Sequence, residues 1–242
     1  MDKPYPLPAA AAEAPPPPSK PHYLGHRERL RERLLAAGAE ALPDYELLEF
    51  LLFAARPRGD LKPLAKALLK RFGGLAGVLG ADKEALLGVE GMGEASAAQL
   101  LAVRAAAVRF LRAEVQERPI ISSWQALIDY CSAQAGFAGT EEFRLLFLDR
   151  KNALIGDERQ QRGTVDHTPV YPREVVKRAL ELGASALIMV HNHPSGDPTP
   201  SKADIEMTRA VAKALAAIGI ALHDHVVLGR GRHTSLKSLG LF

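Results

Sequence analysis

The sequence predicts an α/β protein in which a small all-α domain precedes an α/β sandwich. Two patterns predict this fold class. Residues 25–112 show helical hydrophobic periodicity throughout, whereas residues 143–228 alternate short apolar runs with amphipathic segments. Strands that alternate with helices predict a sheet that helices cover on both faces.

The 242 residues divide into four segments. Residues 1–24 are rich in Pro and Ala and have little to bury, so we expect an extended or disordered tail. Residues 25–112 form the predicted helical domain. Residues 113–122 contain Glu-Arg-Pro and are predicted to be a linker, and residues 123–242 form the α/β domain.

Periodicity and helix-breaking residues predict the individual elements. In the first domain we expect helices over residues 26–37, from a cap at Asp44 through Leu52, over about 62–72, around 83–87 and from Glu94 to about Leu111. In the second domain Ser123 is expected to cap a helix over residues 124–135, and Pro172 to open another. Strands are predicted at residues 143–149, 153–155, 163–167, 184–190 and 221–228.

Composition and charge narrow the class of protein. The apolar fraction of 47% is sufficient for ordinary cores, and a single cysteine suits a reducing compartment. The net charge of +3 is only a mild hint of anionic partners. No apolar run approaches the roughly 18–20 residues that span a bilayer, and prolines interrupt the N-terminus. We therefore expect a cytoplasmic protein with no membrane association.

The strongest chemical signal is the run His-Asn-His-Pro-Ser-Gly-Asp-Pro-Thr-Pro-Ser-Lys-Ala-Asp at residues 191–204. It follows a buried strand, whose alternation sends His191 and His193 to the same face. A loop with three prolines then leads to Ser201, which starts a helix with Asp204 on its first turn. Two imidazoles can therefore meet one carboxylate.

Two interpretations fit this pattern. Three N or O ligands with a fourth position left for water are typical of catalytic zinc, whereas structural zinc is usually closed by thiolates. The chain offers only Cys131 as a thiolate. The alternative is a helix capped by Ser201 and Asp204 beside two polar histidines.

The spacing His-x-His, ten residues, then Asp, together with Pro194 and Ser201, resembles the JAMM (MPN-plus) metalloprotease signature. The longer run is similar to the RadC-like family of bacterial proteins, and the resemblance covers most of residues 25–242. It implies a JAMM/MPN-like, cytidine deaminase-like sandwich. It also implies one Zn²⁺ per chain, with His191, His193 and Asp204 as ligands.

The resemblance also implies a proton carrier and an oxyanion donor. RadC-like sequences have a pattern similar to Glu-x-Phe-x-x-Leu-x-Leu-Asp at the start of an early strand. Residues 141–149 match this pattern, so the resemblance implies that Glu141 is the general acid/base. Glu142 and Glu158 are the alternatives. Ser201 matches the serine that stabilises the oxyanion of the tetrahedral intermediate. A second His-x-His at residues 223–225 is predicted to play a supporting role, with Asp224 orienting a ligand histidine.

Gly91-Met92-Gly93 between two helices resembles a helix-hairpin-helix element, whose backbone N–H groups can hold a phosphate. Glu94, at that helix start, opposes a phosphate. Lys62, Lys66 and Lys70 share one helical face, which is either solvated or a non-specific DNA contact.

The resulting prediction is a zinc-dependent metalloprotease or isopeptidase that acts on an unknown protein or peptide. The alternative is a DNA-binding accessory protein in DNA repair or recombination with a non-catalytic metal site. A nuclease fits less well, because many nucleases clamp the phosphate between two metal ions.

Overall fold

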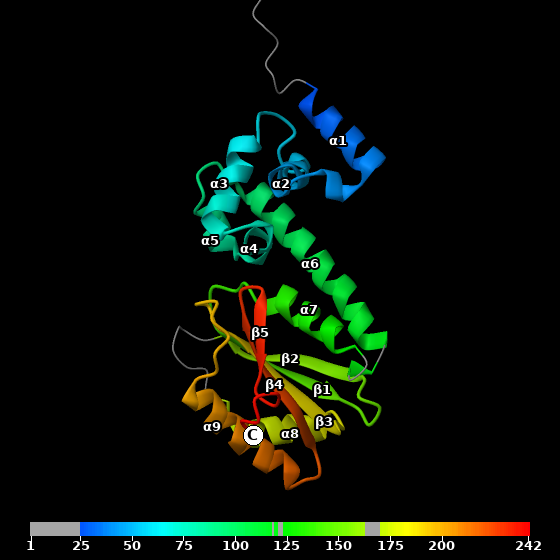
Figure 1. Ribbon diagram of the computed structural model, residues 1–242, viewed down its shortest axis with the longest axis vertical. Coiled ribbons are helices and arrows are strands. Elements are labelled where there is room, and N and C mark those ends of the chain that lie inside the picture. Colours follow the sequence, from blue (N-terminus) through cyan, green and yellow to red (C-terminus); the bar gives the residue numbers. More distant parts are fainter. Residues whose placement is uncertain (1–24, 118, 121–122, 163–169) are drawn as a thin grey trace, which may run out of the picture.

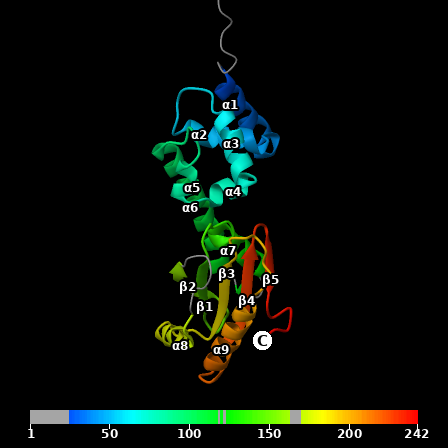
Figure 2. The same cartoon turned by 90° about the vertical axis from the view of Figure 1, so that its left-hand side faces the viewer.

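The computed structural model describes residues 25–117, 119–120, 123–162 and 170–242. The tail predicted for residues 1–24 and the strand predicted for residues 163–167 lie outside this part of the chain. Figures 1 and 2 show a group of helices at one end of an elongated molecule and a sheet with its own helices at the other end. No helix within the described part is long and apolar enough to cross a membrane.

The N-terminal part is helical, as the sequence predicts. Its elements are α1 (His26–Ala37), η1 (Ala39–Ala41), α2 (Asp44–Phe53), α3 (Lys62–Phe72), α4 (Leu75–Gly80), α5 (Lys83–Leu87) and α6 (Glu94–Glu117). The helix α3 ends where Gly73 adopts a left-handed φ of 76° and donates its N–H to the carbonyl of Leu69. The core of this part is formed largely by leucines, among them Leu48, Leu52, Leu64, Leu68 and Leu100.

The helix α6 continues beyond its predicted end near Leu111. It reaches Glu117, inside the stretch predicted as a linker, because its apolar stripe continues through Val108, Leu111 and Val115. Val115 is fully buried in the core of the C-terminal part, whereas Leu100 belongs to the helical core. One helix therefore contributes to both cores.

The C-terminal part contains α7 (Trp124–Ala135), β1 (Glu142–Leu148), β2 (Leu154–Arg162), α8 (Pro172–Glu181), β3 (Ala186–Asn192), α9 (Lys202–Ala216), β4 (Ala221–Gly229) and β5 (Arg232–Ser235). The sheet order is β2-β1-β3-β4-β5. Strands β3 and β4 are parallel, and the other neighbouring pairs are antiparallel.

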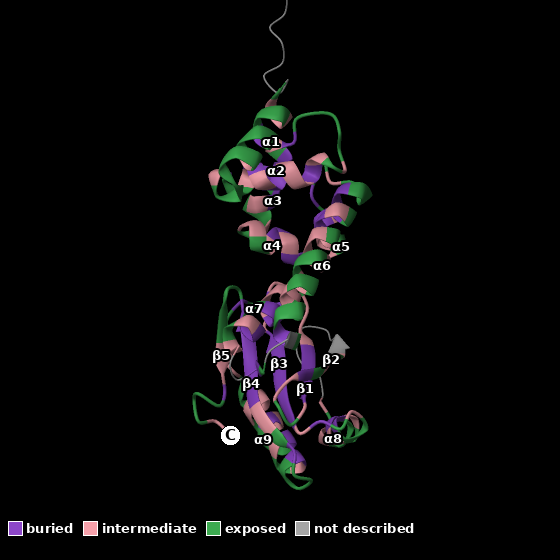
Figure 3. Cartoon of the chain, turned by 90° about the vertical axis from the view of Figure 1, so that its right-hand side faces the viewer, coloured by how far each residue is buried: buried purple, intermediate pink, exposed green. Residues whose placement is uncertain are grey.

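Helices cover both faces of this sheet, which confirms the predicted α/β sandwich. One face packs on α7 and the end of α6 through residues such as Leu146, Ile188 and Val226. The other face packs on α8 and α9 through Phe143 and Met189. The central strands β1, β3 and β4 are correspondingly buried along most of their length (Figure 3).

Several local predictions need correction. Asp44 is the first residue of α2 and not its cap, a position that Pro43 takes without a side-chain hydrogen bond. The hydroxyl of Ser123 donates to the carbonyl of Pro119 and does not cap α7. The strand β2 is longer than the predicted return at residues 153–155. The sequence also does not predict α4 or β5, whose short segments carry too few residues for a periodic signal.

The loop between β3 and α9 packs directly on the end of β4. A Cβ atom at Gly229 would collide with the carbonyl oxygen of Gly196 and would lie 2.9 Å from Cδ of Pro198. The hydrogen bond from the N–H of His193 to the carbonyl of Leu228 is 2.9 Å long. Gly229 therefore allows the backbone contact that holds this loop.

We expect Gly229→Ala to lower the free energy of unfolding by about 1–3 kcal/mol, because the added methyl group overpacks a backbone contact. Urea unfolding measures the effect. Gly139→Ala is the matched control, since a Cβ atom there meets nothing within 4 Å. Equal losses of stability in the two variants would contradict the role assigned to Gly229.

Candidate metal centre

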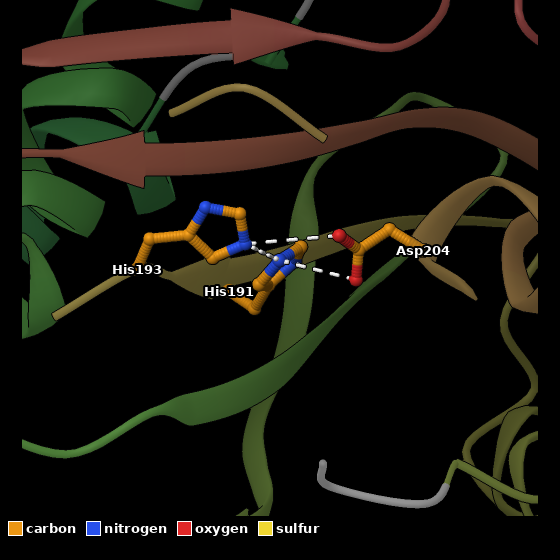
Figure 4. Close-up of side chains that lie close together, drawn as sticks. All are labelled: His191, His193 and Asp204. Carbon is orange, nitrogen blue, oxygen red and sulfur yellow. Dashed lines mark hydrogen bonds and ion pairs between the residues drawn. The ribbon is translucent and has the colours of Figure 1, made fainter. Parts of the chain in front are cut away.

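Three side chains meet where β3 ends and α9 begins. His191 lies in β3, His193 follows the strand directly, and Asp204 lies on the first turn of α9. One ligand atom from each lies within 4.8 Å of the others (Figure 4). The structure thus brings together the three residues that the sequence predicts as metal ligands.

The local sequence explains how each ligand is positioned. The apolar strand β3 is buried over its whole length, and its alternation directs His191 toward α9. A capping box starts α9: the N–H of Asp204 donates to Oγ of Ser201 over 3.1 Å, and the N–H of Ser201 donates to Oδ2 of Asp204 over 2.7 Å. The capping interpretation is therefore correct, and it coexists with the convergence of ligands.

The three groups are close enough to act as ligands of one metal ion. Nε2 of His191 lies 3.0 Å from Nε2 of His193 and 3.4 Å from Oδ1 of Asp204. Nε2 of His193 lies 3.7 Å from Oδ2 of Asp204. Ligand bonds of about 2.0–2.1 Å at the tetrahedral angle place neighbouring ligand atoms roughly 3.3–3.4 Å apart. The His-His-Asp cluster is therefore compatible with a metal site.

The hydrogen bond at the far side of His193 determines which ring nitrogen carries the proton. Nδ1 of His193 lies 2.8 Å from the carbonyl oxygen of Asp197. A carbonyl oxygen only accepts, so Nδ1 carries the hydrogen, and in the neutral ring Nε2 has the lone pair. This lone pair points at Nε2 of His191 and at the carboxylate of Asp204, where a cation satisfies it.

Burial and charge act differently on the three groups. Burial lowers the pKa of His191 from 6.5 to about 4. The hydrogen bond that protonated His193 donates to Asp204 raises the pKa of His193 despite partial burial. Burial alone would raise the pKa of Asp204, but hydrogen bonds from protonated His193 and from Ser201 outweigh it and lower that pKa. The site therefore favours an ionised carboxylate beside a neutral, buried imidazole.

Solvent reaches the centre from one side. The side chain of His191 is 0% exposed, whereas those of His193 and Asp204 are 21% and 14% exposed. The ring of Phe143 stacks on His191 with centroids 5.8 Å apart and closes the inner side with an apolar surface. A ligand or water molecule thus approaches past His193 and Asp204.

The hydroxyl of Ser201 is occupied in this structure. It donates to Oδ2 of Asp204 over 2.6 Å and accepts the N–H of the same residue. Its oxyanion role stays a prediction, which requires the hydroxyl to rotate toward a substrate.

The three candidate carboxylates for proton transfer occupy different surroundings. The charge of Glu141 contributes to raising the pKa of His193, so Glu141 acts on the site. Glu142 is within 3.5 Å of Arg159, and alternation along β1 points it away from the face of Phe143 and His191. The carboxylate of Glu158 is bound by Arg178 at 2.6 Å. Glu142 and Glu158 are thus paired with arginines, and the role of Glu141 as general acid/base stays a prediction.

The second His-x-His motif supports the site differently from the prediction. Asp224 accepts from the N–H groups of His225 and Lys237 and from the hydroxyl of Ser235, so it does not orient His191. His225 does so instead, with Nε2 only 2.8 Å from Nδ1 of His191. Burial lowers the pKa of His225 well below its ordinary value.

Sequence reasoning did not single out Thr208, whose hydroxyl lies 2.6 Å from Nδ1 of His225. The signal in the sequence that could have identified Thr208 is its spacing from Asp204. Thr208 stands four residues after Asp204, on the same face of the helix.

Comparison with known proteins agrees with this geometry. A family model described as the RadC-like JAB domain matches residues 121–241, and a model described as UPF0758 N-terminal matches residues 22–98. A UPF0758 protein of Rhodobacter capsulatus is 61% identical over 212 residues, which cover 88% of this chain and 99% of the relative. The chain belongs to the RadC-like family. Its sheet and covering helices are consistent with the JAB/MPN-like fold, as the resemblance implied.

The RadC-like assignment does not extend to the helix-hairpin-helix detail, which stays a prediction. Gly91 lies between α5 and α6 with φ of 85°, and its carbonyl accepts from Nη1 of Arg56 over 2.8 Å. The side chain of Glu94 is 84% exposed and lies 3.7 Å from Lys83.

We expect acid to destabilise the metal-free protein through His191. Its pKa is 6.5 ordinarily and about 4 when folded, so the unfolded state takes up the proton first. Stability is therefore lost as the pH falls through this window, by up to about 3 kcal/mol for this group. His193, with its raised pKa, has the opposite sign and offsets part of the loss.

Urea unfolding at several pH values between 7 and 4.5, after removal of metal by a chelator, measures this dependence. The variant His191→Gln keeps His193 and His225 but lacks the titrating group, so its stability should fall less steeply. Identical slopes for wild type and variant would show that His191 is not held neutral.

Proposed function

We propose that this protein is a zinc-dependent hydrolase that cleaves an amide or isopeptide bond of a protein or peptide. The observation that carries the proposal is the convergence of His191, His193 and Asp204, whose ligand atoms lie within 4.8 Å of one another. The solvent-accessible side of this cluster leaves room for a fourth ligand, which distinguishes catalytic from structural zinc sites. Membership of the RadC-like family supports a metallohydrolase of the JAMM type.

The donor set suits zinc. Two imidazole nitrogens and one carboxylate oxygen form a borderline set without thiolates, which suits Zn²⁺ better than Mg²⁺ and Ca²⁺, ions that prefer oxygen ligands alone. Cys131 is buried in α7, within the core on the opposite face of the sheet from His191. It therefore does not add a thiolate to the site.

The protein's own residues would divide the remaining chemistry. Bound zinc would supply Lewis acidity, which lowers the pKa of a water molecule to about 7. The carboxylate of Glu141 would act as general acid/base, holding the proton of the attacking water and passing it to the leaving nitrogen of the amide. The hydroxyl of Ser201, once released from Asp204, donates to the carbonyl oxygen of the substrate.

A second candidate function is non-specific DNA binding by the helical part. The ammonium groups of Lys62 and Lys66 lie 5.1 and 5.3 Å from the ring centroid of Tyr45, so they are clustered on one surface. Lys70 follows on the same helical face and is exposed. Such a surface suits a phosphate backbone, and DNA binding does not exclude hydrolysis at the other end of the molecule.

The purified full-length protein is expected to contain about one zinc ion per chain, as three fixed ligands predict. His193→Ala should remove it. Elemental analysis of both proteins, purified without chelators and titrated with zinc, measures this. Absence of zinc from the wild type, combined with salt-sensitive binding of duplex DNA, would reject the hydrolase and favour the DNA-binding candidate.

Glu141→Gln is expected to keep zinc and to lose activity by about 10²–10⁴-fold, the usual contribution of a general acid/base. A quenched fluorescent peptide joined through a lysine ε-amine provides the assay. Glu142→Gln is the matched control and should retain activity, since this side chain pairs with Arg159 away from the site. Full activity in Glu141→Gln would show that another group is the general acid/base.

A further inference from the structure

A chain of buried hydrogen bonds runs behind the candidate metal centre. Nδ1 of His191 lies 2.8 Å from Nε2 of His225, and Nδ1 of His225 lies 2.6 Å from Oγ1 of Thr208. Oγ1 of Thr208 lies 2.5 Å from the carbonyl oxygen of Asp204. The exposed fractions of His191, His225 and Thr208 are 1%, 0% and 0%, so water does not compete for these bonds.

The last acceptor determines the direction of every bond in this chain. The carbonyl oxygen of Asp204 can only accept, so the single hydroxyl hydrogen of Thr208 points to it. Oγ1 of Thr208 then accepts from Nδ1–H of His225. In the neutral ring, Nε2 of His225 carries the lone pair and accepts from Nδ1–H of His191. Nε2 of His191 is thereby left without hydrogen. It faces Asp204 and lies 3.0 Å from Nε2 of His193, a hydrogen bond in which protonated His193 is the donor.

We propose that Thr208 and His225 are positioning residues, which hold His191 in the one tautomer whose Nε2 lone pair can bind a metal ion. The role of this arrangement in metal binding rests on the proposed function. The position of the proton on Nδ1 of His191 does not, because it can be measured in the metal-free protein. The chain starts from one member of the ligand cluster and ends on the backbone of another, so it also ties β3 and β4 to α9.

A role in packing alone would leave the proton position undetermined. Thr208 and Val have nearly the same shape, and Ser keeps the hydroxyl but lacks the methyl group. If Thr208 acts by packing, Thr208→Ser should be the more harmful change. If Thr208 acts by setting the tautomer, Thr208→Val should be the more harmful one, because Nδ1 of His225 then loses its acceptor.

The first readout is the tautomer of His191 in metal-free protein, from ¹⁵N chemical shifts of the imidazole nitrogens. We expect Nδ1–H in the wild type and in Thr208→Ser. In Thr208→Val, His225 is free to carry its proton on Nε2 and to donate it to Nδ1 of His191. The proton of His191 then lies on Nε2, so we expect the Nε2–H form of His191 to appear. Nε2–H as the dominant form of His191 in the wild type would overturn the inference, whatever the variants do.

The second readout is zinc affinity, measured by competition with a chromophoric chelator. Thr208→Val should weaken binding by about 10–100-fold, the usual effect of losing the partner of a ligand histidine, and Thr208→Ser by no more than about threefold. Equal affinities in all three proteins, or a greater loss in Thr208→Ser, would reject the positioning role. A wild type that binds no zinc but shows Nδ1–H at His191 would reject the proposed function and leave the tautomer assignment intact.

Discussion

The parallel pairing of β3 with β4 is the constraint on which the site depends. A chain that leaves the end of β3 must travel back along the sheet before it can enter β4 in the same direction. Here α9 makes this return, so its first turn must lie at the end of β3 where His191 and His193 stand. Asp204 reaches the histidines because the topology brings a helix start to a strand end.

The same pairing explains the support behind the ligands. The register places His225 opposite Met189. Met189 lies two residues before His191 in β3, so His225 and His191 share one face of the sheet. Thr208 lies one helical turn beyond Asp204 and is fully buried. Three polar groups are thereby removed from water. Each unsatisfied one would cost about 1–3 kcal/mol, so the groups are stable there only as mutual partners.

The sequence predicts those features that depend on neighbouring residues in the chain. The glycine that ends α3 and the alternation that pairs His191 with His193 are local signals, and the predicted positions agree with the structure. The extension of α6 was missed because its stripe ends on a core that belongs to the other part of the chain. The bond between His191 and His225 depends on strand register, which no local pattern specifies.

The prediction for Asp224 failed for a reason that the sequence already contained. Adjacent residues in a strand point to opposite faces, so Asp224 could not share the face of His225 and His191. The same rule separates Glu142 from the site, since adjacent Phe143 lies on the face of His191. Strand alternation was therefore a better guide to this site than proximity in sequence.

Asp204 shows how one side chain serves both the fold and the centre. The usual capping box has Glu or Gln at this position of the helix, but here the shorter Asp caps with Oδ2, 2.7 Å from the N–H of Ser201. Its other oxygen, Oδ1, remains 3.4 Å from Nε2 of His191. The capping box thus holds the carboxylate of Asp204 beside His191, so the fold of α9 and the ligand cluster share one side chain.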